Sequence, residues 1–525
     1  MQQSRSQSPI FEFAGASFES PALDAPTFGI IKLNATETVI PCENRALDFQ
    51  IRIDNSGSMS DACSDGRTKM QHVNFTVSQI LRKLGESSIP SSANIKTFDE
   101  TIIEIIDGSI NPDTVEEMVI RVNKIFPNGG TNIYSVLHLE ENAQHASEDR
   151  VFILLSDGQD TTGFGRDKLI RSAAQIHPNT NVIMIGVGND HDASLFKGIV
   201  NRRTCAHYTP VSNVEDIAIA ISELIYGILN KVLKRTTITV FNGEIYSWSA
   251  NKWVSSITAD DIVVGRKKTF NVRSTSPELF RATVQGVRVA SEEVFTMEIV
   301  DAEIGVDLTY EKHRHATMEL LGESVLADQM NSVEIRELKL RLKNKMIELK
   351  AYMDEHKLRD DKRYQVLCDD IFMCHQTMGS AHGTMYAAAR QISQGTQSIY
   401  SNQRDLTGRI SCMNTTIPKM TRGLTEWVDE MDLEDLPPPP TFRREVSHCI
   451  YQMSQEEDGI DDLLATIKSN FQPHPPVIME EKEEEDIEED DTMSNHQMLA
   501  SDDSPYANAM EIAFIREISI ASKSK

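Results

Sequence analysis

The sequence has no apolar run long enough to cross a membrane, and it contains little cysteine. A bilayer-spanning helix takes about 20 predominantly apolar residues, and no such stretch occurs, so we expect no membrane span. The N-terminus, Met1–Ser6, is polar and leads into no apolar signal-peptide core. The 7 cysteines are scattered and form no C-x-x-C pair, which argues against a zinc site or a disulfide framework. We therefore expect a reducing compartment and a cytoplasmic protein.

Basic charge is also scarce. The chain carries 52 Lys and Arg residues against 79 Asp and Glu residues, for a formal net charge of -27. Nucleic-acid-binding proteins carry basic stripes that neutralise phosphates, so we expect no nucleic-acid partner. The sequence also lacks a P-loop and a G-x-S-x-G nucleophile turn. No set of residues points to catalysis, and we expect that the protein is not an enzyme.

A chain of 525 residues is too long for one core, so we expect several domains. Residues 1–27 are rich in Ser, Gln and Pro and are predicted to be disordered. Across residues 46–231, apolar strand-like runs alternate with segments whose apolar residues recur at helical spacing. This alternation predicts an α/β domain with a doubly wound, mainly parallel sheet. The expected strands are Leu47–Ile53, Asn94–Phe98, Val151–Leu155 and Asn181–Val187.

Two other regions show different patterns. Residues 236–325 contain short strand-like runs with turns between them, which predicts an antiparallel all-β module. Residues 28–45 contain one more strand that we expect to pair with this module, so that the α/β domain is inserted within it. Residues 332–430 are predicted to be helical. They begin with a long helix that Ser332 would cap, and its apolar stripe suits a coiled coil.

The C-terminal part, residues 431–525, combines a proline run with acidic blocks. Pro437–Pro440 is typical of a stiff linker or a polyproline II ligand, and the acidic blocks lie within residues 480–491. Because like charges repel one another, we predict a mostly disordered, solvated tail. A further hypothesis is that its carboxylates occupy a cation site elsewhere in the same chain.

Carboxylate and hydroxyl side chains follow one of the expected strands at alternating positions. The run Leu47–Ile53 leads into a D-x-S-x-S loop that supplies Asp54, Ser56 and Ser58 on a glycine-containing turn. Oxygen donors of this kind can converge on one hard cation. Two more segments, Pro127–Asn132 and Leu154–Gly158, lie further along the chain.

These three segments together resemble the metal-ion-dependent adhesion site of von Willebrand factor type A (VWA) domains, here of an intracellular type. Phe98-Asp99 and Ile185–Gly188 also match the family, and the resemblance covers about Ala46 to Asn230. It implies a VWA/Rossmann-like fold and a bound Mg²⁺ (or Mn²⁺). It also implies a protein partner that offers an Asp or Glu carboxylate to the ion. The ligands that the resemblance implies are Asp54, Ser56, Ser58, Thr131 and Asp157.

Other functions remain open from the sequence. The order of domains, and the segment Ala387–Gly395, resemble some eukaryotic proteins tied to ubiquitin transfer. That resemblance implies a non-catalytic scaffold or adaptor, because a RING domain would need regularly spaced Cys and His ligands that are missing. A hydrolase is the second alternative. Aspartate-based phosphatases use D-x-D, and here Ser56 stands at the second acidic position.

Several other groups have plainer interpretations. His313 and His315 are expected in an exposed β-turn, and Asp190–Asp192 in a helix-capping loop. Met59, beside the D-x-S-x-S loop, is expected to pack locally. A last group, expected to face a helical core, comprises Cys368, Cys374 and His375.

Overall fold

Ten stretches of the chain are described in the computed structural model. They are residues 10–21, 25–36, 45–63, 65–143, 149–203, 205–211, 214–259, 261–380, 382–398 and 508–520. All of them belong to one compact unit, which comprises residues 1–430 and 498–525. The proline run and the acidic blocks lie outside the described residues. The structure therefore does not test the hypothesis that the acidic tail occupies a cation site.

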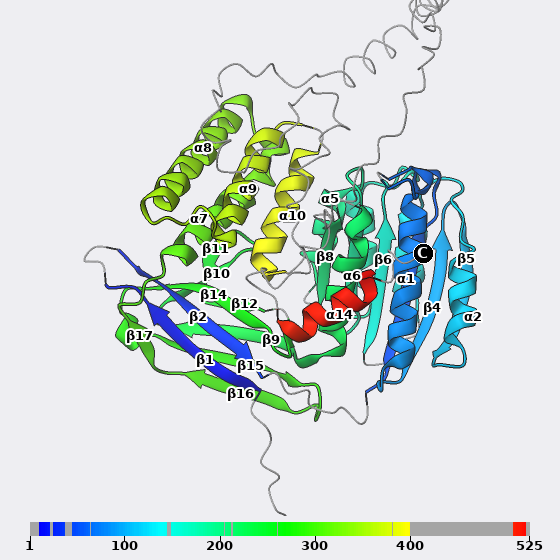
Figure 1. Cartoon of the computed structure of the whole chain (residues 1–525), viewed down its shortest axis with the longest axis horizontal. Helices are drawn as coiled ribbons and strands as arrows, with labels where there is room; N and C mark the ends of the chain where they lie inside the picture. The colour runs from blue at the N-terminus through cyan, green and yellow to red at the C-terminus, as the bar shows by residue number, and fades with distance from the viewer. Residues whose placement is uncertain are drawn as a thin grey trace, which may run out of the picture. The chain divides into compact units, whose positions relative to one another are not determined.

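The α/β domain is built on one six-stranded sheet. Its strands are β3 (Leu47–Asp54), β4 (Ser91–Phe98), β5 (Ile102–Ile110), β6 (Arg150–Ser156), β7 (Asn181–Val187) and β8 (Ala206–Val211). Their order in the sheet is β5-β4-β3-β6-β7-β8. Figure 1 labels β5, β4, β6 and β8 of this sheet. All neighbours are parallel except the edge strand β5, which is antiparallel to β4. The predicted doubly wound, mainly parallel sheet is therefore confirmed.

Helices cover both faces of this sheet. They are α1 (Lys69–Glu86), α2 (Val115–Val122), α3 (Ile133–Glu141), α4 (Arg166–Gln175), α5 (Ala193–Val200) and α6 (Ile217–Leu229). Alternate residues of a strand point to opposite faces. In β6, Val151, Ile153 and Leu155 join the core under α1, α2 and α6. Phe152 and Leu154 join the core under α3, α4 and α5. The central strands are therefore apolar on both sides.

The all-β module consists of two sheets that share one core. Its strands are β1 (Phe11–Phe18), β2 (Thr27–Ala35), β9 (Lys231–Phe241), β10 (Glu244–Ser247), β11 (Lys252–Val254), β12 (Ser256–Thr258), β13 (Ile262–Val263), β14 (Lys267–Ser274), β15 (Arg281–Arg288), β16 (Val294–Ile299) and β17 (Ala302–Ile304). One sheet has the order β11-β10-β14-β2-β1-β17, and the other β12-β9-β15-β16 with β13 beside β9. Apolar residues of both sheets form the core between them, as in a β-sandwich.

The N-terminal strands belong to this sandwich. The strand expected within residues 28–45 is β2, and it pairs antiparallel with β14, so the α/β domain lies between β2 and β9 in the chain. The prediction of disorder for residues 1–27 is wrong for Phe11–Phe18, which form β1. The polar composition of that region concealed a short apolar run, and Phe18 is fully buried in the sandwich core. Because β1 also pairs parallel with β17, the module is not wholly antiparallel.

Four helices follow the sandwich. They are α7 (Thr309–Ser324), α8 (Ser332–Glu355), α9 (Lys362–Thr377) and α10 (Gly383–Thr396). The predicted all-β range 236–325 is wrong at its end, since α7 is helical. The cap of α8 is Asn331 and not Ser332, because the Asn331 side chain accepts hydrogen bonds from the backbone of Val333 and Glu334. No helix in the described ranges is long and apolar enough to cross a membrane.

A last helix lies in the segment predicted to be a disordered tail. α14 (Ala509–Ile520) packs against α6 and α1 of the α/β domain (Figure 1). Its Ile515 is fully buried in the core under those helices. Glu511 pairs with Arg266 of the sandwich, and Glu517 pairs with Lys83 of α1 at 2.7 Å. The prediction for 431–525 is wrong here, because apolar residues at a spacing of three let a short helix bury one face.

Candidate metal centre

The predicted ligand loops meet where the central strands end. β3 ends at Asp54 and β6 at Ser156, and these two strands are parallel neighbours, so their following loops leave the same edge of the sheet. Carboxyl ends of parallel strands are the usual ligand-binding edge of an open α/β sheet. The first loop continues as a short 3-10 turn, η1 (Gly57–Ser60). Met59 in this turn is buried in the core, which confirms the prediction that it packs locally.

Asp54 is held in place by its neighbours. Its Oδ1 accepts a hydrogen bond from the Ser56 amide at 2.9 Å, and its Oδ2 accepts one from the Ser156 hydroxyl at 2.5 Å. Burial raises the pKa of Asp54 to about 6, although the hydrogen bonds from Ser156 and Ser56 act in the opposite direction. A nearby cation would favour the charged form. The carboxylate is therefore fixed in direction, and a bound cation would stabilise its negative charge.

Ser56, Ser58 and Asp157 come together at the surface of the site. The two serine Oγ atoms lie 3.1 Å apart, and the Ser58 hydroxyl donates to Asp157 Oδ1 at 2.8 Å. Ser56 and Asp157 are buried, whereas Ser58 is exposed. Three of the predicted ligands thus share one hydrogen-bonded cluster that opens to solvent at Ser58.

The loop that carries Thr131 is tied to both other loops. The Gly57 amide donates to the carbonyl of Gly129 at 3.0 Å, and the Thr161 amide donates to the Thr131 carbonyl at 2.8 Å. The Thr131 hydroxyl lies beside Gly158: a Cβ added there would be 3.1 Å from it. Glycine at 158 therefore permits the approach of the fifth predicted ligand, Thr131, to the Asp157 loop.

Lys69 also belongs to this site, and sequence reasoning missed it. Its Nζ donates to Asp157 Oδ2 at 2.8 Å and to Asp61 Oδ2 at 3.0 Å. Burial disfavours the charged lysine, but Asp157 and Asp61 together raise its pKa above the usual value. Lys69 begins α1, where it resembled an ordinary surface residue of a helix. Ser156, which holds Asp54, was missed for a similar reason, because it read as the end of a buried strand.

The donor set fits a hard divalent cation. The five side chains offer only oxygen atoms, from two carboxylates and three hydroxyls, and Mg²⁺ takes oxygen ligands together with several waters. Among the described residues, no group of three or more His, Cys, Asp or Glu side chains is placed to hold a metal ion. A softer, nitrogen- or sulfur-bound ion such as structural zinc therefore has no matching set in that part of the chain.

The other groups singled out in the sequence lie elsewhere. Asp192 Oδ1 accepts from the Leu195 amide at 2.9 Å at the start of α5, which confirms the predicted helix-capping loop. Cys374 is buried in α9, as predicted. The prediction for His313 and His315 is wrong, because both are buried in α7. The His315 ring packs on aromatic residues from distant strands, namely Phe28, Tyr246 and Trp253.

Comparisons with known proteins identify the domain. The family model for the von Willebrand factor type A domain matches residues 50–224, which contain all five predicted ligands and all of the sheet except the start of β3. No curated protein matches the chain. Residues 50–224 are therefore a von Willebrand factor type A domain.

Several solved structures are similar to this chain at low identity. A von Willebrand factor type A protein from Catenulispora acidiphila has 14% identity and a TM-score of 0.48, over 75% of this chain and 98% of that one. The ArnB paralog VWA2 from Sulfolobus acidocaldarius has 13% identity and a TM-score of 0.43, over 73% and 98%. Proximal thread matrix protein 1 from the mussel byssus, with a zinc-occupied MIDAS motif, has 16% identity and a TM-score of 0.28, over 37% and 47%. Likenesses this distant add nothing about function.

Proposed function

We propose that the VWA domain is a protein-interaction module that depends on a divalent cation, with Mg²⁺ (or Mn²⁺) as the ion. Asp54, Ser56, Ser58, Thr131 and Asp157 would hold it. The observation that carries this proposal is the hydrogen-bonded cluster of Ser56, Ser58 and Asp157, which opens to solvent at one point. A bound divalent cation would replace these mutual hydrogen bonds, because hydroxyl and carboxylate oxygens are the ligands that Mg²⁺ takes.

The charge of the ligand set supports an acidic partner. Two carboxylates balance a dipositive ion, and neutral hydroxyls withdraw less of its charge than further carboxylates would. When bound, the ion would supply an electrophilic position for one carboxylate oxygen. The chain's own residues fix the ligand directions: Ser156 orients Asp54, and Lys69 orients Asp157. We propose that the partner contributes an Asp or Glu residue at this position.

Titration calorimetry with MgCl2 tests the metal site. The full chain should bind the ion, and Asp54→Ala should lose binding while it keeps its circular dichroism spectrum. A matched control is Asp107→Ala, which removes an exposed carboxylate from β5 of the same sheet. Equal binding by the wild type and Asp54→Ala would reject the site, and so would equal loss in both variants.

Selection of peptides from a display library tests the partner chemistry. With Mg²⁺ present, we expect enrichment of peptides that contain Asp or Glu, and chelation should release them. Replacing the enriched residue by Asn or Gln should abolish binding. Binding that survives both chelation and this replacement would contradict a metal-mediated contact, even if the metal itself binds.

The adaptor alternative receives no added support from α10. The segment that suggested a link to ubiquitin transfer lies in this helix, and Ala387, Ala388 and Ala389 are all buried there. Tight packing of a small-residue helix accounts for that composition without a partner. We propose a non-catalytic, cytoplasmic protein. Cys368 and Cys374, which form no disulfide among the described residues, support a reducing compartment.

A further inference from the structure

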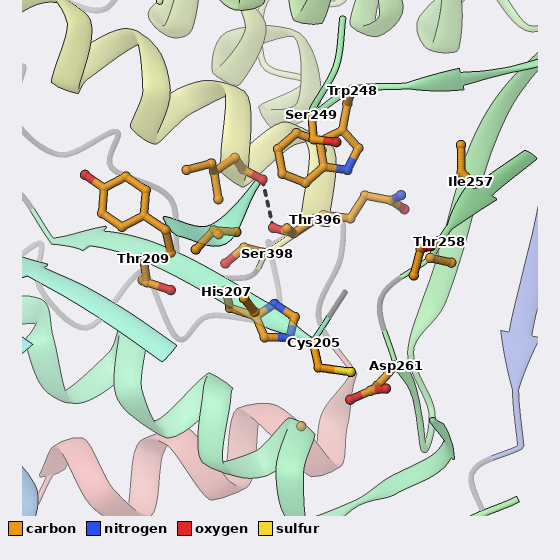
Figure 2. Close-up of a pocket in the computed structure, with 18 of the residues that line it drawn as sticks. Cys205, His207, Thr209, Trp248, Ser249, Ile257, Thr258, Asp261, Thr396 and Ser398 are labelled. Atoms are coloured by element: carbon orange, nitrogen blue, oxygen red, sulfur yellow. Dashed lines mark hydrogen bonds between the residues drawn. The ribbon is translucent and has the colours of Figure 1, made fainter. Parts of the chain in front are cut away.

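A cavity lies away from the metal centre, where the α/β domain, the sandwich and α10 meet. Its volume is about 660 Å³, within the range of small-molecule sites. Figure 2 shows side chains around it from β8, from the turn between β10 and β11, from β12 and from the end of α10. None of the predicted metal ligands lines it. The cavity is therefore a separate candidate site.

The lining of this cavity is basic, although the chain as a whole is strongly acidic. Two carboxylates, Glu223 and Asp261, reach it, and both already have partners. Glu223 lies 3.6 Å from Arg266, which also pairs with Glu511 behind the lining, and Asp261 lies 2.5 Å from Lys231. Positive charge is in excess. The seven Lys and Arg residues that line the cavity are Lys197, Arg203, Lys231, Arg235, Lys252, Arg266 and Lys268.

Two of these cations, on the side of the α/β domain, contact neutral groups. Lys197 Nζ donates to the amide oxygen of Gln391 at 2.9 Å, and burial lowers the pKa of Lys197 to about 8. The Arg203 guanidinium donates to four backbone carbonyls, including that of Ile176 at 2.7 Å. An anion in the cavity would favour the charged form of Lys197. Because their partners are neutral, the positive charges of Lys197 and Arg203 are not cancelled on this side of the cavity.

Two more cations project from the sandwich. Arg235 of β9 and Lys252 of β11 are exposed, and across the described residues neither has a hydrogen bond or an ion pair. Arg235 has a left-handed backbone, with φ of 54°, a conformation that is uncommon for a residue other than glycine. Long cationic side chains at the rim of a basic recess can reach an anion without breaking an existing pair.

Hydroxyl groups complete the lining. Thr209 of β8, Ser249 of the β10–β11 turn and Thr258 of β12 line the cavity (Figure 2). Ser398, just after α10, also lines it, but its hydroxyl already donates to Glu223 Oε2 at 2.6 Å. We propose that this cavity binds a small molecule that carries two or more phosphate groups. Ammonium, guanidinium and hydroxyl donors together are the groups that proteins use to hold phosphate oxygens.

The arrangement of the charges determines the ligand class. The cations come from both domains, so a ligand with several anionic groups can contact more of them than a single anionic group can. A nucleic-acid duplex needs an open basic stripe and not a recess. An acidic peptide is the competing occupant, and it is distinguished below by direct titration.

Calorimetric titration of the full chain in chelator tests the proposal. The probes are pyrophosphate, ATP and inositol hexakisphosphate, beside inorganic phosphate, citrate and a hexaglutamate peptide. We expect at least one of the three polyphosphates to bind more tightly than inorganic phosphate and citrate. Asp54→Ala should bind it equally well, because the metal centre takes no part. Failure of the metal-site proposal would therefore leave this result unchanged.

Variants locate the binding. Arg235→Gln combined with Lys252→Gln should weaken binding by about tenfold or more, since two charge-assisted contacts are lost. The matched control combines Lys267→Gln with Arg281→Gln, which removes the same charge from exposed positions outside the lining. If the first pair fails to fold, Lys197→Met takes its place under the same criterion. The absence of polyphosphate binding at millimolar concentration, equal loss in the control, or binding of hexaglutamate alone would overturn the proposal.

Discussion

Lys69 should weaken the affinity of the VWA domain for its cation. In the described structure the Lys69 ammonium already neutralises part of Asp157, with an Nζ–Oδ2 distance of 2.8 Å. The Asp157 side chain is fully buried, and that of Lys69 is 11% exposed. A divalent ion bound next to Asp157 must share this carboxylate with Lys69 and experience its repulsion. Lys69→Met should therefore tighten the binding of Mg²⁺.

The size of the effect follows from a thermodynamic cycle. Removing one partner of a buried pair typically destabilises a protein by about 3–5 kcal/mol. Here the cost in the metal-free protein should be smaller, about 1–3 kcal/mol, because Ser58 still donates to Asp157 and the second partner, Asp61, is largely exposed. If the ion compensates Asp157 in the variant, the same free energy appears as affinity. The dissociation constant should then fall by roughly 5- to 150-fold.

Calorimetry measures the affinity for Mg²⁺, and thermal melting measures the stability of the protein with and without the ion. Lys69→Met should melt below the wild type without Mg²⁺ and approach it at saturating Mg²⁺. Lys83→Met is the matched control: it alters the same helix near its other end, where Lys83 pairs with Glu517. It should leave the dissociation constant unchanged. An equal or weaker affinity in Lys69→Met, with a neutral control, would refute the reasoning.

Two further predictions concern the described core. Burial lowers the pKa of His191 to about 4, so the unfolded chain binds the proton first and the free energy of unfolding falls as pH drops from about 6.5 towards 4. The expected loss of unfolding free energy at pH 5 is about 2 kcal/mol. Denaturant unfolding at pH 7 and pH 5 measures this loss, which should be smaller in His191→Gln than in the wild type. The same pH dependence in both proteins would contradict the prediction. Ile515→Ala, in a fully buried position of α14, should cost about 2–4 kcal/mol and expose residues 509–520 to hydrogen exchange. Met510→Ala, on the exposed side of that helix, should not, and equal protection in both variants would argue against docking of α14.

The sequence predicted the parts of the site that are local. Asp54, Ser56 and Ser58 follow a buried strand at fixed spacing, so their convergence depends on one turn. The α/β fold could also be predicted, because alternating apolar strands and helices leave few other arrangements. The edge strands β5 and β8 were not predicted, because partly exposed strands at the edge of a sheet need no continuous apolar run.

Contacts between distant residues could not be predicted in the same way. The Lys69–Asp157 pair joins positions 88 apart, and nothing near Lys69 in the sequence marks it as different from other helical lysines. His315 is buried by aromatic rings from three separate strands, so its local sequence looked like a polar turn. For α14 the local signal was present, because its apolar residues have helical spacing. The acidic blocks before it led to the prediction of a disordered tail instead.

The insertion of the VWA domain between β2 and β9 has a consequence for synthesis on the ribosome. β2 pairs with β14, which begins about 230 residues later. At roughly 5–20 residues per second, that delay is about 10–50 s. During this time the β1–β2 hairpin has an unpaired edge, and such edges recruit other strands. The VWA domain can meanwhile fold, and its two ends then lie together, since Arg45 donates to the carbonyl of Ile228 at 2.7 Å. Closure of the sandwich should therefore be a late, non-local step, and a slowly translating ribosome would prolong the exposure of that edge.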